Sequence, residues 1–200
     1  MYLMQKLTLA TLSALALSLT CSRVFAVDGT IIVNGVVTDQ TCTLKGDGGF
    51  ATGLKDNITV DLGTMPKSKF TPTLPDPRKH GFTLYLTNAA GTGACDVATT
   101  KAFQGIHLSA ISANDLDATD KTLLVNKAID ASTINPIFIQ ISSINGVVDF
   151  SAPWGVQAKS PIYTLGDETY LQYDAVPASK TGIVDAQNYT ATINYTMHYN

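Results

Sequence analysis

The chain has 200 residues, of which 45% are hydrophobic and 14% are charged, and its formal net charge is −3. This length predicts one domain with a sizeable core. The low charged fraction argues against extended disorder, and the acidic balance argues against a nucleic-acid partner, which would need a basic surface.

Residues 1–26 are typical of a cleaved secretory signal peptide. A lone Lys6 precedes an apolar run from Leu7 to Leu19, and Val24 and Ala26 stand at the small-residue positions that a signal peptidase reads. The run is shorter than the roughly 20 residues that cross a bilayer, so a retained anchor is the less favoured alternative. We therefore expect an exported mature chain that begins at residue 27.

Residues 29–37 form a predicted strand with an unusual face. Its alternate positions are Gly29, Ile31, Val33, Gly35 and Val37. A buried central strand would normally carry side chains where this segment has two glycines.

The cysteines predict one disulfide bond. Removal of Cys21 with the signal peptide leaves Cys42 and Cys95, an even pair in an oxidising compartment. Two free buried thiols are the alternative. The spacing excludes a CxxC redox motif and a cysteine-rich zinc site.

The rest of the mature chain shows short period-2 runs and no extended 3.6-residue period, which predicts an all-β protein. Turns are predicted at 46–49, 66–77, 91–93, 145–146 and 166–167. This spacing favours a β-sandwich. The predicted strands between the two ends cover 58–62, 82–87, 104–111, 137–141 and 169–176.

The C-terminal segment predicts a long strand with one apolar face. Polar residues separate Ala191, Ile193, Tyr195, Met197 and Tyr199, and the pattern continues to Asn200 at the end of the chain. Terminal residues usually fray unless another strand holds them. Ordinary pairing within one sandwich remains an alternative explanation for both terminal strands.

Taken in order, these features resemble the subunits of chaperone-usher pili, the type 1-like fimbrial pilins. Residues 28–42 are similar to the N-terminal extension and first disulfide cysteine of that family, and the closing Tyr-x-Met-x-Tyr-Asn is similar to its last strand. Two departures stand out. Residues 89–94 are inserted before the second cysteine, and Gln187-Asn188 stands where a glycine often opens the last strand.

The resemblance implies an incomplete immunoglobulin-like β-sandwich that is completed by donor-strand exchange. The implied organisation is a signal peptide (1–26), a donor extension (27–40) and a pilin domain (41–200). The donor residues would be Ile31, Val33, Gly35 and Val37. The acceptor edge, which a periplasmic chaperone would also bind, would be Ile193, Tyr195, Met197, Tyr199 and Asn200.

Catalytic and cofactor sites find little support in the sequence. His80, His107 and His198 form no metal-ligand spacing, and the acidic residues near Asp117 lack the glycine and closing glutamate of a calcium loop. Trp154 could stack on a sugar, although capping a strand or loop is the favoured explanation. We expect no enzyme activity and no cofactor.

The predicted function is a structural subunit of a cell-surface fimbrium that takes part in cell adhesion. Its partners would be identical or related pilins, a periplasmic chaperone and an outer-membrane usher; the sequence indicates no host receptor. The alternative is a secreted or tip sugar-binding β-sandwich adhesin. A two-domain tip adhesin would need a receptor domain before the pilin pattern, and here that pattern begins almost at the predicted cleavage site.

Overall fold

The computed structural model describes residues 42–71 and 78–200, all within the unit Gly35–Asn200. The predicted signal peptide and the extension 27–40, with Ile31, Val33, Gly35 and Val37, lie outside the described residues. None of the helices in the described part of the chain has the length and hydrophobicity of a membrane span.

Most of the strands form one antiparallel sheet with the order β3-β2-β1-β4-β10-β7-β6. Two short strands extend it, since β8 pairs with β7 and β9 pairs with β10. The strands of this sheet are β1 (Thr43–Gly49), β2 (Ala51–Leu54), β3 (Thr59–Val60), β4 (His80–Thr87), β6 (Leu123–Val125), β7 (Phe138–Ser143), β8 (Gly146–Val147), β9 (Tyr163–Leu165) and β10 (Glu168–Ala178).

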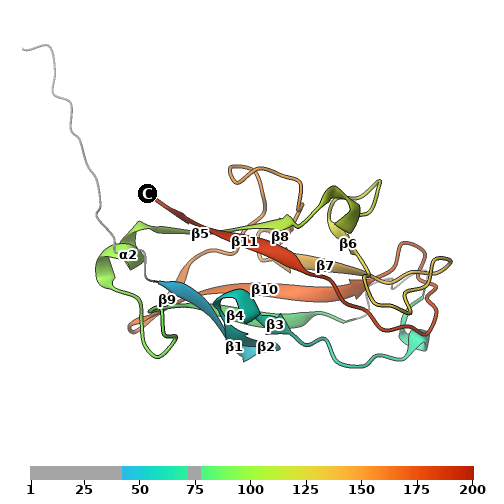
Figure 1. The fold of residues 1–200 in the computed structure, drawn as a ribbon, viewed down its shortest axis with the longest axis horizontal. Helices are drawn as coiled ribbons and strands as arrows, with labels where there is room; N and C mark the ends of the chain where they lie inside the picture. The colour runs from blue at the N-terminus through green and yellow to red at the C-terminus, as the bar shows by residue number, and fades with distance from the viewer. Residues whose placement is uncertain (1–41, 72–77) are drawn as a thin grey trace, which may run out of the picture. The chain divides into compact units, whose positions relative to one another are not determined.

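The second sheet has two antiparallel strands, β5 (Phe103–Ala110) and β11 (Ile193–Tyr199). Figure 1 shows this pair lying over β10 and β4 of the first sheet. The main core forms between the layers, with Leu84, Leu86 and Leu171 from the first sheet packed with Ile106 and Leu108 from the second. Short helices complete the described elements: η2 (Lys55–Asn57), η3 (Lys67–Lys69), α2 (Val97–Ala102) and η4 (Ala113–Asp115).

Period-2 patterns located the central strands well. The predictions over 82–87, 104–111, 137–141 and 169–176 are confirmed by β4, β5, β7 and β10. The predicted turn at 166–167 is the two-residue connection between β9 and β10. Of the predicted strand 58–62, Thr59–Val60 forms the short strand β3, and the Asp61 N–H continues the pairing by donating to the Phe50 carbonyl.

The turn predicted at 46–49 starts too early, because these residues belong to β1 and the β1–β2 hairpin turns at Gly49-Phe50, between the paired residues Gly48 and Ala51. The register of β1 against β4 shifts between Gly46 and Gly49, which marks a bulge. Gly49 has a φ of 64°, and a Cβ there would collide with the carbonyl oxygen of Gly81. Glycine is therefore required by a close backbone approach inside the sheet.

Helix α2 was not predicted from the sequence. It has six residues, too few for a 3.6-residue period to show, and its start is set by Asp96, whose side chain accepts a hydrogen bond from the Thr99 N–H at 2.9 Å. The helix leads directly into β5.

The predicted disulfide between Cys42 and Cys95 is confirmed, with a Cα to Cα distance of 5.5 Å. Thr43 lies opposite Thr87 on β4, and Thr87 also bridges to Ala94. The inserted residues 89–94 form a turn in which the Asn88 N–H donates to the Gly93 carbonyl. That turn reverses the chain and returns the second cysteine to the first.

The outer edge of β5 is covered by a side chain. The Leu108 N–H donates to Gln157 Oε1 at 2.9 Å, and Gln157 Nε2 donates to the Leu108 carbonyl at 2.8 Å. Gln157 is buried, so its amide group takes the place of a neighbouring strand at this point. The other edge of the two-stranded sheet belongs to β11.

Candidate functional site

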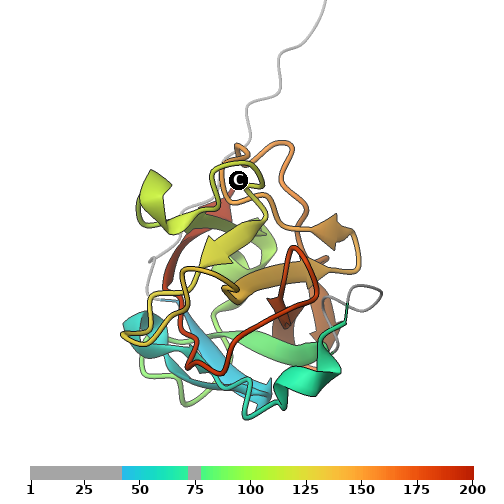
Figure 2. The same ribbon diagram turned by 90° about the vertical axis from the view of Figure 1, so that its right-hand side faces the viewer.

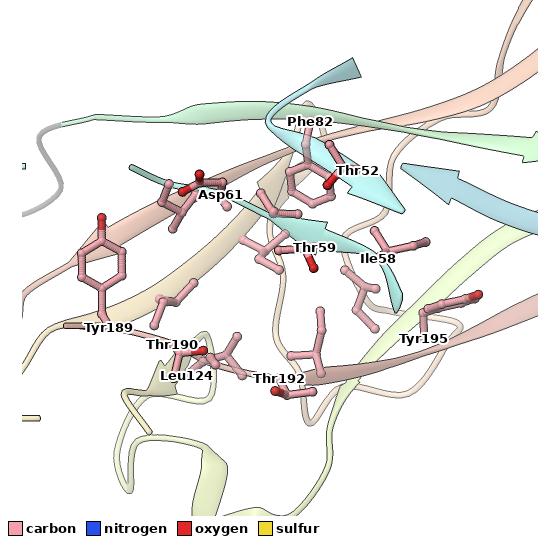
Figure 3. A pocket seen from close by; sticks show the side chains of 18 of the residues that line it. Thr52, Ile58, Thr59, Asp61, Phe82, Leu124, Tyr189, Thr190, Thr192 and Tyr195 are labelled. Atoms are coloured by element: carbon pink, nitrogen blue, oxygen red, sulfur yellow. The ribbon is translucent and has the colours of Figure 1, made fainter. Parts of the chain in front are cut away.

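A groove of about 1120 Å³ runs between β11 and the segment 58–65. One wall consists of residues 187–195, and the other includes Ile58, Val60 and Leu62. Its floor is the hydrophobic core. Figure 3 shows these side chains from close by, with Tyr189 and Tyr195 at opposite sides of the view and Phe82 near its top. The lining from the core is Phe82, Leu84, Leu108, Leu124, Ile139, Ile141 and Ala175.

Both walls carry apolar side chains that are only partly buried. On the first wall these are Ile58, Val60 and Leu62; on β11 and the residues before it they are Tyr189, Ala191, Ile193, Tyr195, Met197 and Tyr199. All of them pack against the main core. Covering this apolar surface would be favourable by roughly 25 cal/mol for each Å² removed from water. The core is therefore incomplete along the groove.

The backbone of β11 also faces the groove with unpaired groups. Leu108 lies opposite Tyr195, and both Leu108 main-chain groups bond to Gln157, so this is a non-hydrogen-bonded pair. The N–H and C=O of Tyr195 consequently point away from β5. Ile193 and Met197 lie two positions either side of Tyr195 in the same ladder, so their N–H and C=O groups also point away from β5. Within the described residues, β11 pairs with β5 alone.

The structure brings the predicted acceptor residues to one face of β11. Ile193 and Tyr195 line the groove, and Met197 and Tyr199 continue the apolar row against the core. Tyr199 also packs on Phe103, with 5.7 Å between ring centroids. Asn200 is exposed, and its N–H donates to the Ala102 carbonyl at 2.8 Å.

The wall before β11 is held by a side-chain network that sequence reasoning missed. Figure 2 looks at the end of the sheets where the loop 126–137 and the segment 183–192 lie. Gln187 makes five hydrogen bonds, four of them to the loop 126–137 and one to Asp185 of its own segment. Its Oε1 accepts from Asn126 Nδ2 and from the N–H groups of Ser132 and Ile137, and its Nε2 donates to the carbonyls of Asn135 and Asp185.

Replacing Gln187 should loosen this wall. Gln187→Ala leaves several partly buried backbone groups without partners, so we expect a loss of about 2–3 kcal/mol in the free energy of unfolding. Gln172→Ala is the matched control, because Gln172 is exposed on β10 and should cost under about 0.5 kcal/mol. Urea denaturation of both variants measures the difference. Equal stabilities would show that the network does not hold the wall.

The outer face of the two-stranded sheet places two of the three histidines together. His198 stacks on Trp154 with ring centroids 4.0 Å apart and planes 2° apart, and His107 lies 6.2 Å from His198. The pKa of His198 is lowered by burial and by the nearby His107 and Lys159. His80 is buried on β4. Trp154 thus packs on the outer face of β11 through His198; the sequence favoured a cap on a strand or loop.

The acidic residues near Asp117 pair with cations of the chain. Asp115 bonds to Lys127 at 2.7 Å and Asp117 to Lys180 at 2.9 Å. Where the chain is described, the one cluster with metal-ligand geometry is Cys42, Cys95 and Asp96, and its two sulfur atoms are joined in the disulfide. Because these groups already have partners within the chain, the groove is the candidate site for binding another molecule.

Comparisons with known proteins point to the same fold. No protein-family model and no curated protein matches the chain. Among solved structures, it is similar to the P pilus rod subunit PapA, with a TM-score of 0.53 and 18% sequence identity over 86% of this chain and 100% of that chain. This chain has an all-β, immunoglobulin-like pilin fold. At this identity the likeness shows the fold alone.

Proposed function

We propose that this chain is a structural subunit of a chaperone-usher pilus. The observation that carries the proposal is the groove, where an apolar cleft lies beside β11, which within the described residues pairs with β5 alone and turns its other backbone edge to the groove. Such an edge is a template for strand addition, in which main-chain bonds supply affinity and alternate side chains fill pockets. The similarity of fold to a pilus rod subunit supports the same conclusion.

The donor in this proposal is the extension 27–40 of a neighbouring copy. Ile31, Val33 and Val37 would enter the groove, and Gly35 would lie where the groove is shallow. Before assembly a periplasmic chaperone would cover the same edge and hold the terminal carboxylate of Asn200, and an outer-membrane usher would catalyse the exchange. Residues 1–26 would direct export, and 41–200 would form the pilin domain of a cell-surface fibre that serves adhesion.

The sugar-binding alternative rested on Trp154. Its ring is stacked against His198, and Lys159 Nζ lies 4.3 Å from the ring centroid. Lys159 Nζ also donates to the Trp154 carbonyl at 2.6 Å, which holds the lysine in place. A ring engaged in this way is a poor platform for a sugar.

Peptide complementation tests the proposed function. A mature chain lacking 27–40 should be unstable or self-associate, because its groove has no strand. Adding a synthetic peptide of residues 27–40 should raise its melting temperature; at 100 times the dissociation constant the gain is about 2.7 kcal/mol. Differential scanning fluorimetry with a scrambled peptide as control measures this. A truncated chain that is monomeric and folds cooperatively without any peptide would contradict the proposal.

A further inference from the structure

One hydrogen bond joins the two walls of the groove. The hydroxyl of Tyr189, on the wall before β11, donates to the carbonyl of Gly63 on the opposite wall at 2.9 Å. The two residues are 126 positions apart in the chain. Figure 3 shows Tyr189 at one end of the row of lining residues, with its side chain directed toward the wall that carries Asp61.

The Tyr189 side chain lies where an inserted strand would have to pass. Two strands that flank a third are separated by two inter-strand spacings, about 9.6 Å. At this position the phenol ring and its hydrogen bond span the gap instead. Beyond it, Tyr189 packs against a second hydrophobic cluster of Phe70, Ile137 and Val184 with Met65. Burial and the Asp61 carboxylate raise the pKa of Tyr189, which keeps the hydroxyl protonated as a donor.

We propose that Tyr189 is the end stop of the acceptor groove and limits the length of strand that the groove can hold. Past this residue a strand would have to break the bond to Gly63 and displace the ring from its cluster. The positions left for inward side chains are those beside Ala191, Ile193, Tyr195, Met197 and Tyr199. A strand must therefore leave the groove at Tyr189.

This inference rests on the proposed function and specifies its occupant, the segment 29–37 of a second copy. That segment has five inward positions, as many as β11 and Ala191 offer. The next position after Val37 on the same face is Asp39, and a carboxylate is costly to bury in an apolar site. On the other side the next position is Val27. The number of alternate positions in the segment 29–37 therefore matches the number of positions that the groove offers up to Tyr189.

The test measures how the dissociation rate depends on peptide length. The full chain carrying Val33→Asp serves as acceptor, because its own extension should not fill a groove. Three labelled peptides are compared by fluorescence anisotropy: residues 28–38, residues 26–38, which add Val27, and residues 28–40 with Asp39→Val. Each is measured on acceptors with Tyr189, Tyr189→Phe and Tyr189→Ala, and on Tyr163→Ala as a control on β9.

The direction in which the peptide lies in the groove decides which of the two longer peptides brings its added valine to Tyr189. On the acceptor that keeps Tyr189, that peptide should dissociate at a rate within twofold of the rate of peptide 28–38. On Tyr189→Ala the same peptide should dissociate at least tenfold more slowly, because one more valine is buried. Tyr189→Phe keeps the ring and should fall between. Binding of peptide 28–38 to every acceptor shows that each one is folded.

Two results would overturn the inference, and they are distinguishable. Suppose that peptide 28–38 binds, but that both longer peptides dissociate from the Tyr189→Ala acceptor at the same rates as from the acceptor with Tyr189. Then Tyr189 is not an end stop, and the proposed function stands. If peptide 28–38 binds no acceptor, the proposed function fails and the end stop fails with it.

Discussion

Replacing Val33 by aspartate should abolish surface fibres, whereas Asn34→Asp should leave them nearly normal. In the proposed assembly Val33 enters the apolar groove of a neighbouring subunit. A carboxylate there either stays charged at a cost of several kcal/mol or must bind a proton. In the same proposed strand Asn34 would belong to the opposite face, so the same charge there would stay in water. The defect repeats at every junction of the fibre.

The groove of the acceptor explains why the effect should depend on the face. Its floor is formed by buried side chains such as Phe82 and Ile139, and its walls by Val60 and Ile193. Gly35→Leu should also interfere if its pocket is shallow, because overpacking costs roughly 1–3 kcal/mol at each site. The acceptor domain of the Val33→Asp chain should remain folded, since the change lies in the extension.

Electron microscopy of fibres, together with the amount of periplasmic chaperone-subunit complex, measures these effects. Val33→Asp should lose fibres and keep the complex. Normal fibres would contradict the assignment of the donor strand. Loss of both fibres and complex would mean that residues 29–37 belong to the core of their own subunit.

Removing the disulfide should have the next largest effect. The Cys42→Ser, Cys95→Ser double variant should lose about 2–5 kcal/mol in the free energy of unfolding, because the bond closes a 53-residue separation. It ties the start of β1 to the residue before the α2 N-cap. Strand β1 contributes Leu44 to the core and α2 leads into β5, which contributes Phe103, so the loss should be felt throughout the domain.

Chemical denaturation of the double variant with bound donor peptide measures this loss. Cys21→Ser is the matched control, because residue 21 lies in the predicted signal peptide and should not affect the mature protein. A loss under about 1 kcal/mol, or two alkylatable thiols in the native mature chain, would contradict the prediction.

Local patterns in the sequence determined the strands that carry side chains on both faces. In β11 the alternation of Ile193, Tyr195 and Met197 with polar residues was sufficient, because a strand buried on one face must repeat every two residues. The cysteine count determined the disulfide in the same way. In β1 the glycine-rich run was read as a turn, since glycine has no side chain to show a period.

Tertiary structure alone decided which segments form the groove. Tyr189 and Gly63 meet although 126 positions separate them, and nothing in either local pattern indicates the contact. The same holds for Gln187, whose five partners come from a loop far away in the chain and from Asp185. Periodicity reports which face of a strand is buried. Which strand lies beside it, and where a partner is missing, follows from the packing of the whole domain.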